Sequence, residues 1–215
     1  MLSILGTYMS QELYSKITDA LVQDGYIVIN NAINPQLTSD LLNLAKKSKN
    51  FRRAAISRAT SKQINPEKRR DKILWMDYDN GVQSQFLDFS NGLKDYLNRE
   101  LFMCITYYES HFAIYEEGDF YETHLDAFKN SKNRVVTTVY YLNDEWKEEN
   151  GGELVVYDDK NSFLKKVIPQ ANTLVVFLSE KFPHEVLAAK RKRYSIAGWF
   201  RVDKLVLPGL DVIAI

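Results

Sequence analysis

The sequence predicts an α+β protein in which helices of the first half support an antiparallel β-sandwich or barrel formed by the second half. Apolar residues recur at helical spacing in three stretches before Met103, which predicts amphipathic helices. After Met103 the pattern changes to short β-rich runs separated by Gly, Asn, Asp and Pro, at a density typical of antiparallel folds. Because no helical stretch separates these runs, the sequence argues against a parallel sheet with crossover helices.

Three helices and one strand are expected in the first half. The first helix begins at Ser10, its expected N-cap, and ends before Gly25. A strand follows over Tyr26–Ile29, where β-branched and aromatic residues are concentrated. A second helix follows Pro35, since proline suits the first turn of a helix, and a third covers Ser84–Phe102.

The β-rich runs of the second half are short and close together. They comprise residues 105–108, 112–115, 134–142, 154–157, 173–178 and 194–200. A chain of 215 residues fits one structural domain. Within it we expect a helical support region over residues 1–102, a β core over residues 103–203 and a C-terminal extension over residues 204–215.

The segment from about residue 52 to residue 72 differs from its surroundings, because it is rich in Lys and Arg and poor in apolar residues. A solvated basic loop or hairpin is one interpretation. A mobile lid over a binding site is the other, since long loops often carry function.

The composition excludes several classes of protein. Twenty-eight Lys and Arg balance 28 Asp and Glu, so the chain lacks the positive charge of a dedicated nucleic-acid-binding protein. The single cysteine, Cys104, excludes an intramolecular disulfide and a Cys-rich zinc site. No apolar stretch approaches the roughly 18–20 residues of a membrane span, and Met1 to Met9 lack the basic residues of a secretory signal. We therefore expect a cytoplasmic protein with no membrane partner and no nucleic-acid partner.

Two of the three histidines stand in a pattern that suggests a metal site. In an extended chain His124 and Asp126 point to the same side, because side chains alternate between the two faces of a strand. His184 could complete a face of two histidines and one carboxylate, which binds Fe(II) and leaves further coordination positions open. By itself the pattern is weak, since a single histidine on a strand is more often a hydrogen-bonded group than a ligand.

Arg193 begins the last β-rich run. Alternation places it on one face with Ser195, Ala197 and Trp199. A cation inside a barrel is costly unless it meets an anion, and the planar guanidinium group suits a carboxylate. The alternative is that Arg193 only ends a basic surface run that starts at Lys190.

Five motifs in this order resemble those of the Fe(II)- and 2-oxoglutarate-dependent dioxygenases. They are His124-Leu125-Asp126, the run from Arg134 to Asn143, Gly151-Gly152-Glu153-Leu154, Pro183-His184-Glu185-Val186, and Arg193-Tyr194 with Trp199-Phe200. The resemblance is greatest to prolyl hydroxylases of the hypoxia-sensing type and their bacterial relatives, and it covers nearly half of the chain, from Tyr107 to Asp203. It implies a double-stranded β-helix core of the jelly-roll, cupin-like kind.

The resemblance also implies roles for individual residues. The implied metal ligands are His124, Asp126 and His184. Arg193 would bind the distal carboxylate of 2-oxoglutarate with help from Tyr141, while Tyr115 would reach the end of the cosubstrate near the metal. Trp199 would form a wall of the pocket.

The reaction implied is hydroxylation of a prolyl residue in an extended, proline-containing segment of a protein, with decarboxylation of 2-oxoglutarate to succinate and CO₂. Fe(II) would be the metal, O₂ the second cosubstrate and ascorbate the reductant. Arg134 is the best candidate for contact with the peptide. His111 shares the parity of Tyr115 and is a second candidate, although a packed strand residue is the simpler interpretation.

The sequence leaves three alternative functions open. The same chemistry could act on a small molecule or a free amino acid. The chain could instead be a catalytically silent β-sandwich binding module, although every motif residue is retained. A nucleic-acid demethylase would need stacking aromatics beside its basic groove, and none lies between Arg52 and Ile73.

Overall fold

The computed structural model describes residues 2–54, 56–58, 61–63, 67–127 and 133–203, with backbone alone for residues 2–9, 56–58 and 61–63. Three α-helices precede most of the strands: α1 (Leu2–Gln23), α2 (Pro35–Lys47) and α3 (Gly81–Leu101). A short 3₁₀-helix, η1 (Glu148–Asn150), lies within the β-rich half. The side chains of Asn34 and Asn80 cap α2 and α3, because each accepts a hydrogen bond from a backbone N–H of the first turn.

Two antiparallel sheets form the core, as the sequence predicts. The larger sheet has the spatial order β1 (Tyr26–Asn30), β11 (Thr173–Leu178), β8 (Arg134–Tyr141), β13 (Arg193–Arg201), β6 (Tyr107–Tyr115), β5 (Lys72–Trp75) and β2 (Arg52–Arg53). The smaller sheet has the order β10 (Phe163–Val167), β9 (Leu154–Tyr157), β12 (His184–Val186) and β7 (Tyr121–His124). Strands β3 (Ile56–Arg58) and β4 (Ser61–Gln63) form a separate hairpin. The result is the predicted double-stranded β-helix with helical support.

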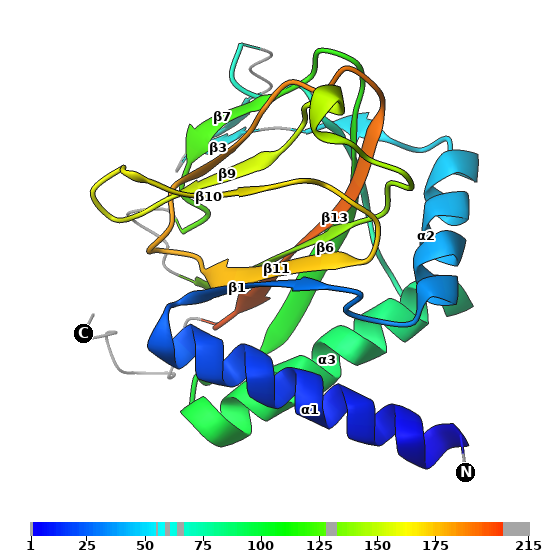
Figure 1. Ribbon diagram of the computed structural model, residues 1–215, viewed down its shortest axis with the longest axis vertical. Helices are drawn as coiled ribbons and strands as arrows, with labels where there is room; N and C mark the ends of the chain where they lie inside the picture. Colours follow the sequence, from blue (N-terminus) through cyan, green and yellow to red (C-terminus); the bar gives the residue numbers. More distant parts are fainter. Residues whose placement is uncertain (1, 55, 59–60, 64–66, 128–132, 204–215) are drawn as a thin grey trace.

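The larger sheet separates two hydrophobic clusters. Helices cover one of its faces and the smaller sheet covers the other (Figure 1). Residues from the helices pack against the outer face, where Phe112 and Phe200 lie, while Ala113 and Tyr141 face the smaller sheet. Because neighbouring residues of a strand point to opposite faces, the two clusters alternate along each central strand. The face of the larger sheet that looks toward the smaller sheet, here called the inner face, is therefore the one on which a binding site can lie.

Several element boundaries differ from the sequence-based expectation, and α3 begins at Gly81 rather than at Ser84. Helix α1 begins at Leu2 and runs through Ser10, because the residues before Ser10 include no proline and several good helix formers. The runs 105–108 and 112–115 belong to one strand, β6. The polar residues between them stay in the strand, where Glu109 is ion-paired with Arg134 and Arg201.

The predicted lid segment, residues 52–72, holds β2, the β3–β4 hairpin and the first residue of β5. Residues 55, 59, 60 and 64–66 of this segment lie outside the described residues, as does the predicted C-terminal extension, residues 204–215. The role of residues 52–72 as a lid stays a prediction.

None of the described helices combines the length and the hydropathy that a transmembrane helix needs.

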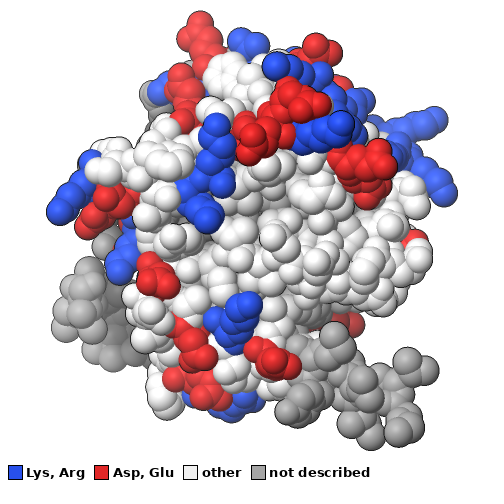
Figure 2. Space-filling view, in the orientation of Figure 1, with Lys and Arg blue, Asp and Glu red and all other residues white. Residues whose placement is uncertain are grey.

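Charged side chains of both signs are interspersed on the face shown in Figure 2. This mixture agrees with the balance of 28 basic and 28 acidic residues in the sequence.

Candidate active site

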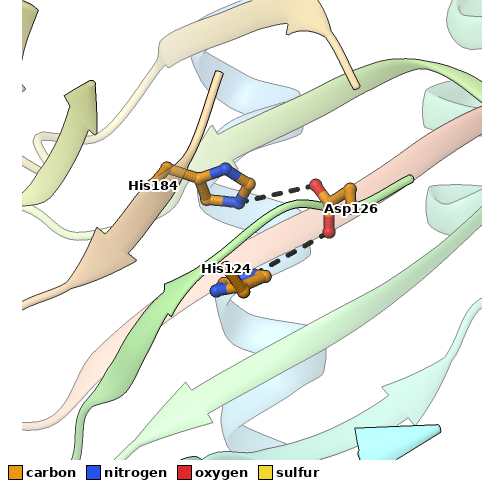
Figure 3. A group of neighbouring side chains, drawn as sticks. All are labelled: His124, Asp126 and His184. Carbon is orange, nitrogen blue, oxygen red and sulfur yellow. Dashed lines mark ion pairs between the residues drawn. The ribbon is translucent and has the colours of Figure 1, made fainter. Parts of the chain in front are cut away.

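The structure brings His124, Asp126 and His184 together. His124 ends β7, Asp126 follows two residues later, and His184 begins β12 directly opposite His124 in the antiparallel register. One ligand atom from each residue lies within 4.8 Å of the other two. Both imidazoles point toward the carboxylate, with Nε2 of His124 at 3.8 Å from Oδ1 and Nε2 of His184 at 3.5 Å from Oδ2 (Figure 3).

Each imidazole is oriented by a backbone carbonyl two residues earlier. Nδ1 of His124 lies 2.7 Å from the carbonyl oxygen of Glu122, and Nδ1 of His184 lies 2.9 Å from that of Phe182. A carbonyl oxygen can only accept, so Nδ1 must carry the proton and donate. The lone pair of each neutral ring is therefore on Nε2, which faces Asp126. Burial, followed by the neighbouring His184, lowers the pKa of His124 and favours this neutral form.

Asp126 is buried and held as a carboxylate. Burial alone would raise its pKa, but the neighbouring His184 and His124 keep the pKa below the ordinary value. The Thr137 hydroxyl donates to Oδ2 of Asp126 at 2.9 Å, and Ser179 lies 2.8 Å from Thr137. Two imidazole nitrogens and one carboxylate with a hydrogen-bonding partner form the donor set that suits Fe(II).

Arg193 lies inside the protein, not on its surface. Its residue exposure is 1%, and its guanidinium group packs at 4.8 Å from the ring centroid of Tyr115 and 5.1 Å from that of Tyr141. Nη1 donates to Ser195, but Nε has no hydrogen-bond partner among the described residues, and no carboxylate of those residues pairs with the group. A buried cation without an anion fits a site for a ligand carboxylate.

Three further predicted residues lie on the same inner face as this guanidinium group. Tyr141 and Tyr115 are both buried, and the hydroxyl of Tyr141 has no hydrogen-bond partner among the described residues. Burial raises the pKa of Tyr141 to about 12 even though Arg193 lowers it, so the hydroxyl keeps its proton. Trp199 is also buried on the inner face, and its Nε1 has no partner among the described residues. These polar atoms fit a ligand such as 2-oxoglutarate.

The two predicted substrate residues lie on either side of Trp199. The Arg134 guanidinium group stacks 3.7 Å from the Trp199 ring centroid and donates to Glu109 at 3.1 Å. His111 is buried, with its ring centroid 5.4 Å from that of Trp199 and 5.1 Å from that of Trp75. Trp75 is half-exposed, so the aromatic group reaches the surface.

Sequence reasoning missed several residues around the site. Thr137 could have been found, because it lies four residues before Tyr141 on β8 and therefore points to the same face of the sheet. Arg69 and Tyr121 had no comparable signal, since they meet only through the pairing of distant segments. Asp71 pairs with Arg69 two residues away. Arg69 and Asp71 belong to a charge-rich run whose composition is typical of a solvent-exposed loop.

Comparison with known proteins adds to this geometry. Residues 110–201 match the family model of the 2OG-Fe(II) oxygenase superfamily. A hypoxia-inducible factor prolyl hydroxylase of Caenorhabditis elegans is 36% identical over 95 residues, which cover 43% of this chain and 13% of that protein. The human prolyl hydroxylase EGLN3 is 34% identical over 85 residues, which cover 39% of this chain and 35% of that protein. The matched stretch thus spans about a third or less of these curated relatives.

Solved structures match over nearly the whole chain. A Pseudomonas putida prolyl-4-hydroxylase has a TM-score of 0.81 and 31% identity, covering 88% of this chain and 99% of that one. A prolyl hydroxylase from Trichoplax adhaerens, in complex with a peptide fragment of the hypoxia inducible factor oxygen degradation domain, has a TM-score of 0.78 and 28% identity. That match covers 89% of this chain and 90% of the other.

Proposed function

This chain belongs to the 2OG-Fe(II) oxygenase superfamily, and we propose that it hydroxylates a prolyl residue in an extended segment of a protein. It is a 2-oxoglutarate-dependent dioxygenase, so Fe(II), 2-oxoglutarate and O₂ are the metal and the cosubstrates of its family.

We assign Fe(II) to His124, Asp126 and His184. The support is the convergence of the three ligand atoms within 4.8 Å and the Nδ1 hydrogen bonds that leave both Nε2 lone pairs free. The bound iron and 2-oxoglutarate supply the oxidation, in which 2-oxoglutarate and O₂ give succinate and CO₂ and one oxygen atom enters a C–H bond. Burial favours the neutral form of His124, and the neighbouring histidines favour the ionised form of Asp126, so the site offers a negative charge to a divalent cation.

We assign the distal carboxylate of 2-oxoglutarate to Arg193. This buried guanidinium group on the inner face, which has no carboxylate partner among the described residues, is the single observation that carries the proposal. Tyr141 would donate its hydroxyl proton to the same carboxylate. Tyr115 would lie toward the metal end, and Trp199 would close one wall and exclude water. Ascorbate is proposed as the reductant that keeps the iron in the Fe(II) state.

The substrate assignment rests on the relatives and on Arg134. Two solved structures, which match 88% and 89% of this chain, are prolyl hydroxylases, one of them in complex with a peptide fragment. Stacking on Trp199 and the hydrogen bond to Glu109 fix the Arg134 guanidinium group beside the site. Its remaining N–H groups would donate to backbone carbonyls of an extended peptide, and His111 would support Trp199 from the other side.

The test is incubation of the purified protein with Fe(II), 2-oxoglutarate, ascorbate and a cell lysate, followed by mass spectrometry of tryptic peptides. We expect succinate release and a gain of one oxygen atom on proline in a small set of proteins, with neither in the His124→Ala variant. A gain on another residue type would replace the proline assignment. Succinate formation driven only by free amino acids or other small molecules would favour the small-molecule alternative.

A further inference from the structure

A short bridging segment, residues 68–71, joins the two sheets beside His124. The N–H of Glu122 donates to the carbonyl of Lys68 at 2.8 Å, and the N–H of Arg70 donates to the carbonyl of Phe120 at 3.1 Å. Between these bonds Arg69 pairs with Tyr121 as an isolated antiparallel bridge. The next residue after the segment begins β5 of the larger sheet. The bridging segment therefore covers the edge of β7 and connects it to the opposite sheet.

Arg69 and Asp71 form a buried ion pair within this segment. Nε and Nη2 of Arg69 donate to the two carboxylate oxygens of Asp71 at 2.5 and 2.8 Å. The two side chains are only 13% and 0% exposed. Burial alone would lower the pKa of Arg69, but the hydrogen bonds and the charge of Asp71 raise it, so the guanidinium group stays charged. Such a pair needs close geometry to offset its desolvation.

Tyr121 connects this ion pair to His124. The Cζ atom of Arg69 lies 4.6 Å from the ring centroid of Tyr121. The ring of Tyr121 stacks on that of His124, with centroids 3.6 Å apart and an angle of 18° between the planes. The carbonyl that orients Nδ1 of His124 belongs to Glu122, whose own N–H is bonded to Lys68. The plane and the rotation of the His124 ring thus both depend on contacts of the bridging segment.

From these contacts we propose that Arg69, Asp71 and Tyr121 are positioning residues that hold the His124 imidazole in the orientation needed for metal binding. The inference rests on the proposed role of His124 as a metal ligand. Support matters more for His124 than for His184, because the side chain of His124 is 19% exposed and that of His184 is 5% exposed. His184 also packs edge-on against Phe177, at 4.9 Å between centroids.

The test measures Co(II) binding to the metal-free protein, by visible absorption and by tryptophan fluorescence, without any turnover. Loss of partners that orient a ligand typically weakens metal binding by roughly 10–100-fold. We expect a loss of this size for Tyr121→Ala, and a smaller loss with an altered Co(II) spectrum for the double variant Arg69→Met/Asp71→Asn. The double variant removes both charges, so neither is left buried alone. Tyr121→Phe keeps the ring and should bind Co(II) within about twofold of the wild type, since stacking does not need the hydroxyl.

The matched control is Tyr96→Ala on α3. Arg99 lies over the Tyr96 ring at 4.6 Å, the same distance as in the Arg69–Tyr121 pair, but Tyr96 packs against the outer cluster. Tyr96→Ala should lose stability and keep the Co(II) dissociation constant. If Tyr121→Ala and the double variant are folded by circular dichroism and bind Co(II) like the wild type, the positioning proposal is wrong. If Tyr121→Ala does not fold, the double variant alone decides.

Two further results separate this inference from the proposed function. A wild type that fails to bind Co(II), or a His124→Ala variant that binds it equally well, would overturn the metal assignment itself. Wild-type binding that is lost in His124→Ala but unchanged in the Tyr121 and double variants would overturn only the positioning role.

Discussion

His184 lies directly opposite His124 across the antiparallel pair β12 and β7, with ring centroids 4.4 Å apart. Backbone hydrogen bonding thereby fixes the relation between two side chains that are far apart in the sequence. Asp126 reaches both rings from the turn after β7. Among the described residues these three form the one group of possible metal ligands, so loss of any one of them removes a donor that the other described residues do not replace.

We therefore expect His124→Ala and Asp126→Ala to abolish succinate formation from 2-oxoglutarate while the fold persists. A chelator should have the same effect on the wild type, with activity restored by Fe(II). Asp24→Ala, at an exposed position after α1, is the matched control and should keep full activity. Full turnover in either ligand variant would contradict the metal assignment.

Arg193→Lys should raise the KM for 2-oxoglutarate by roughly 10–100-fold, because a lysine cannot reproduce the paired charge-assisted hydrogen bonds of a guanidinium group. Arg191→Lys is the control, since Arg191 is exposed and only two residues away. Steady-state kinetics at varied 2-oxoglutarate concentration give the answer. Equal KM values for the two variants would show that Arg193 does not bind the cosubstrate.

Tyr141→Phe should reduce the stabilisation of the protein by 2-oxoglutarate. The variant would lose the hydrogen bond that we propose between Tyr141 and the cosubstrate carboxylate, and such a bond is worth about 1.5–3 kcal/mol when the acceptor is charged. Thermal unfolding with and without 2-oxoglutarate, in the presence of a redox-inert divalent metal, measures the difference. An identical rise in Tm for both proteins would argue against a role for the Tyr141 hydroxyl.

Gly152→Ala should damage both folding and cosubstrate binding. Gly152 has a φ of +72°, and an added Cβ would lie 2.8 Å from Cβ of Ala189 and 3.3 Å from Cδ of Arg193. Gly118 has a φ of +80° but nothing within 4 Å of an added Cβ. We expect Gly118→Ala to cost about 1–2 kcal/mol from backbone strain, and Gly152→Ala to cost about 1–3 kcal/mol more from overpacking. Denaturant unfolding compares the two, and equal losses would contradict the steric argument.

We expect the free energy of unfolding to depend on pH through the protonation of His111. Burial, followed by the charge of Arg69, lowers the pKa of His111 from 6.5 to about 4. Between these values the unfolded chain binds more protons than the folded chain, so the free energy of unfolding falls as the pH falls from 6.5 to 4. The full contribution is about 3 kcal/mol and is present above the unfolded pKa.

The matched measurement compares wild type and His111→Asn by denaturant unfolding across this range. The stability difference between the two proteins should shrink in acid. A constant difference would mean that His111 does not titrate on unfolding in this range.

Much of this architecture follows from local sequence pattern. Alternation along β13 places Arg193 and Ser195 on the inner face. Asp126 lies beyond the end of β7, so strand alternation alone does not account for its approach to His124. The succession of short β-rich runs predicts the antiparallel sheets, because turn-forming residues separate each run from the next. Residues at helix ends were less predictable, since Ser10 is equally compatible with a cap and with the interior of α1.

Long-range pairing explains what the sequence could not predict. Arg69 meets Tyr121 only because the bridging segment lies along the edge of β7, and no local periodicity carries that information. The ion pair with Asp71 is equally hidden, because charged residues two apart in a basic run are typical of solvated loops.

Strand β13 has one further consequence. Its outward residues Ile196 and Phe200 belong to the hydrophobic cluster beneath the helices. Arg193 and Ser195 lie on the other face of the strand, toward the smaller sheet. A substitution at an inward position of β13 can therefore change the space between the two sheets and leave the packing of this strand against the helices intact.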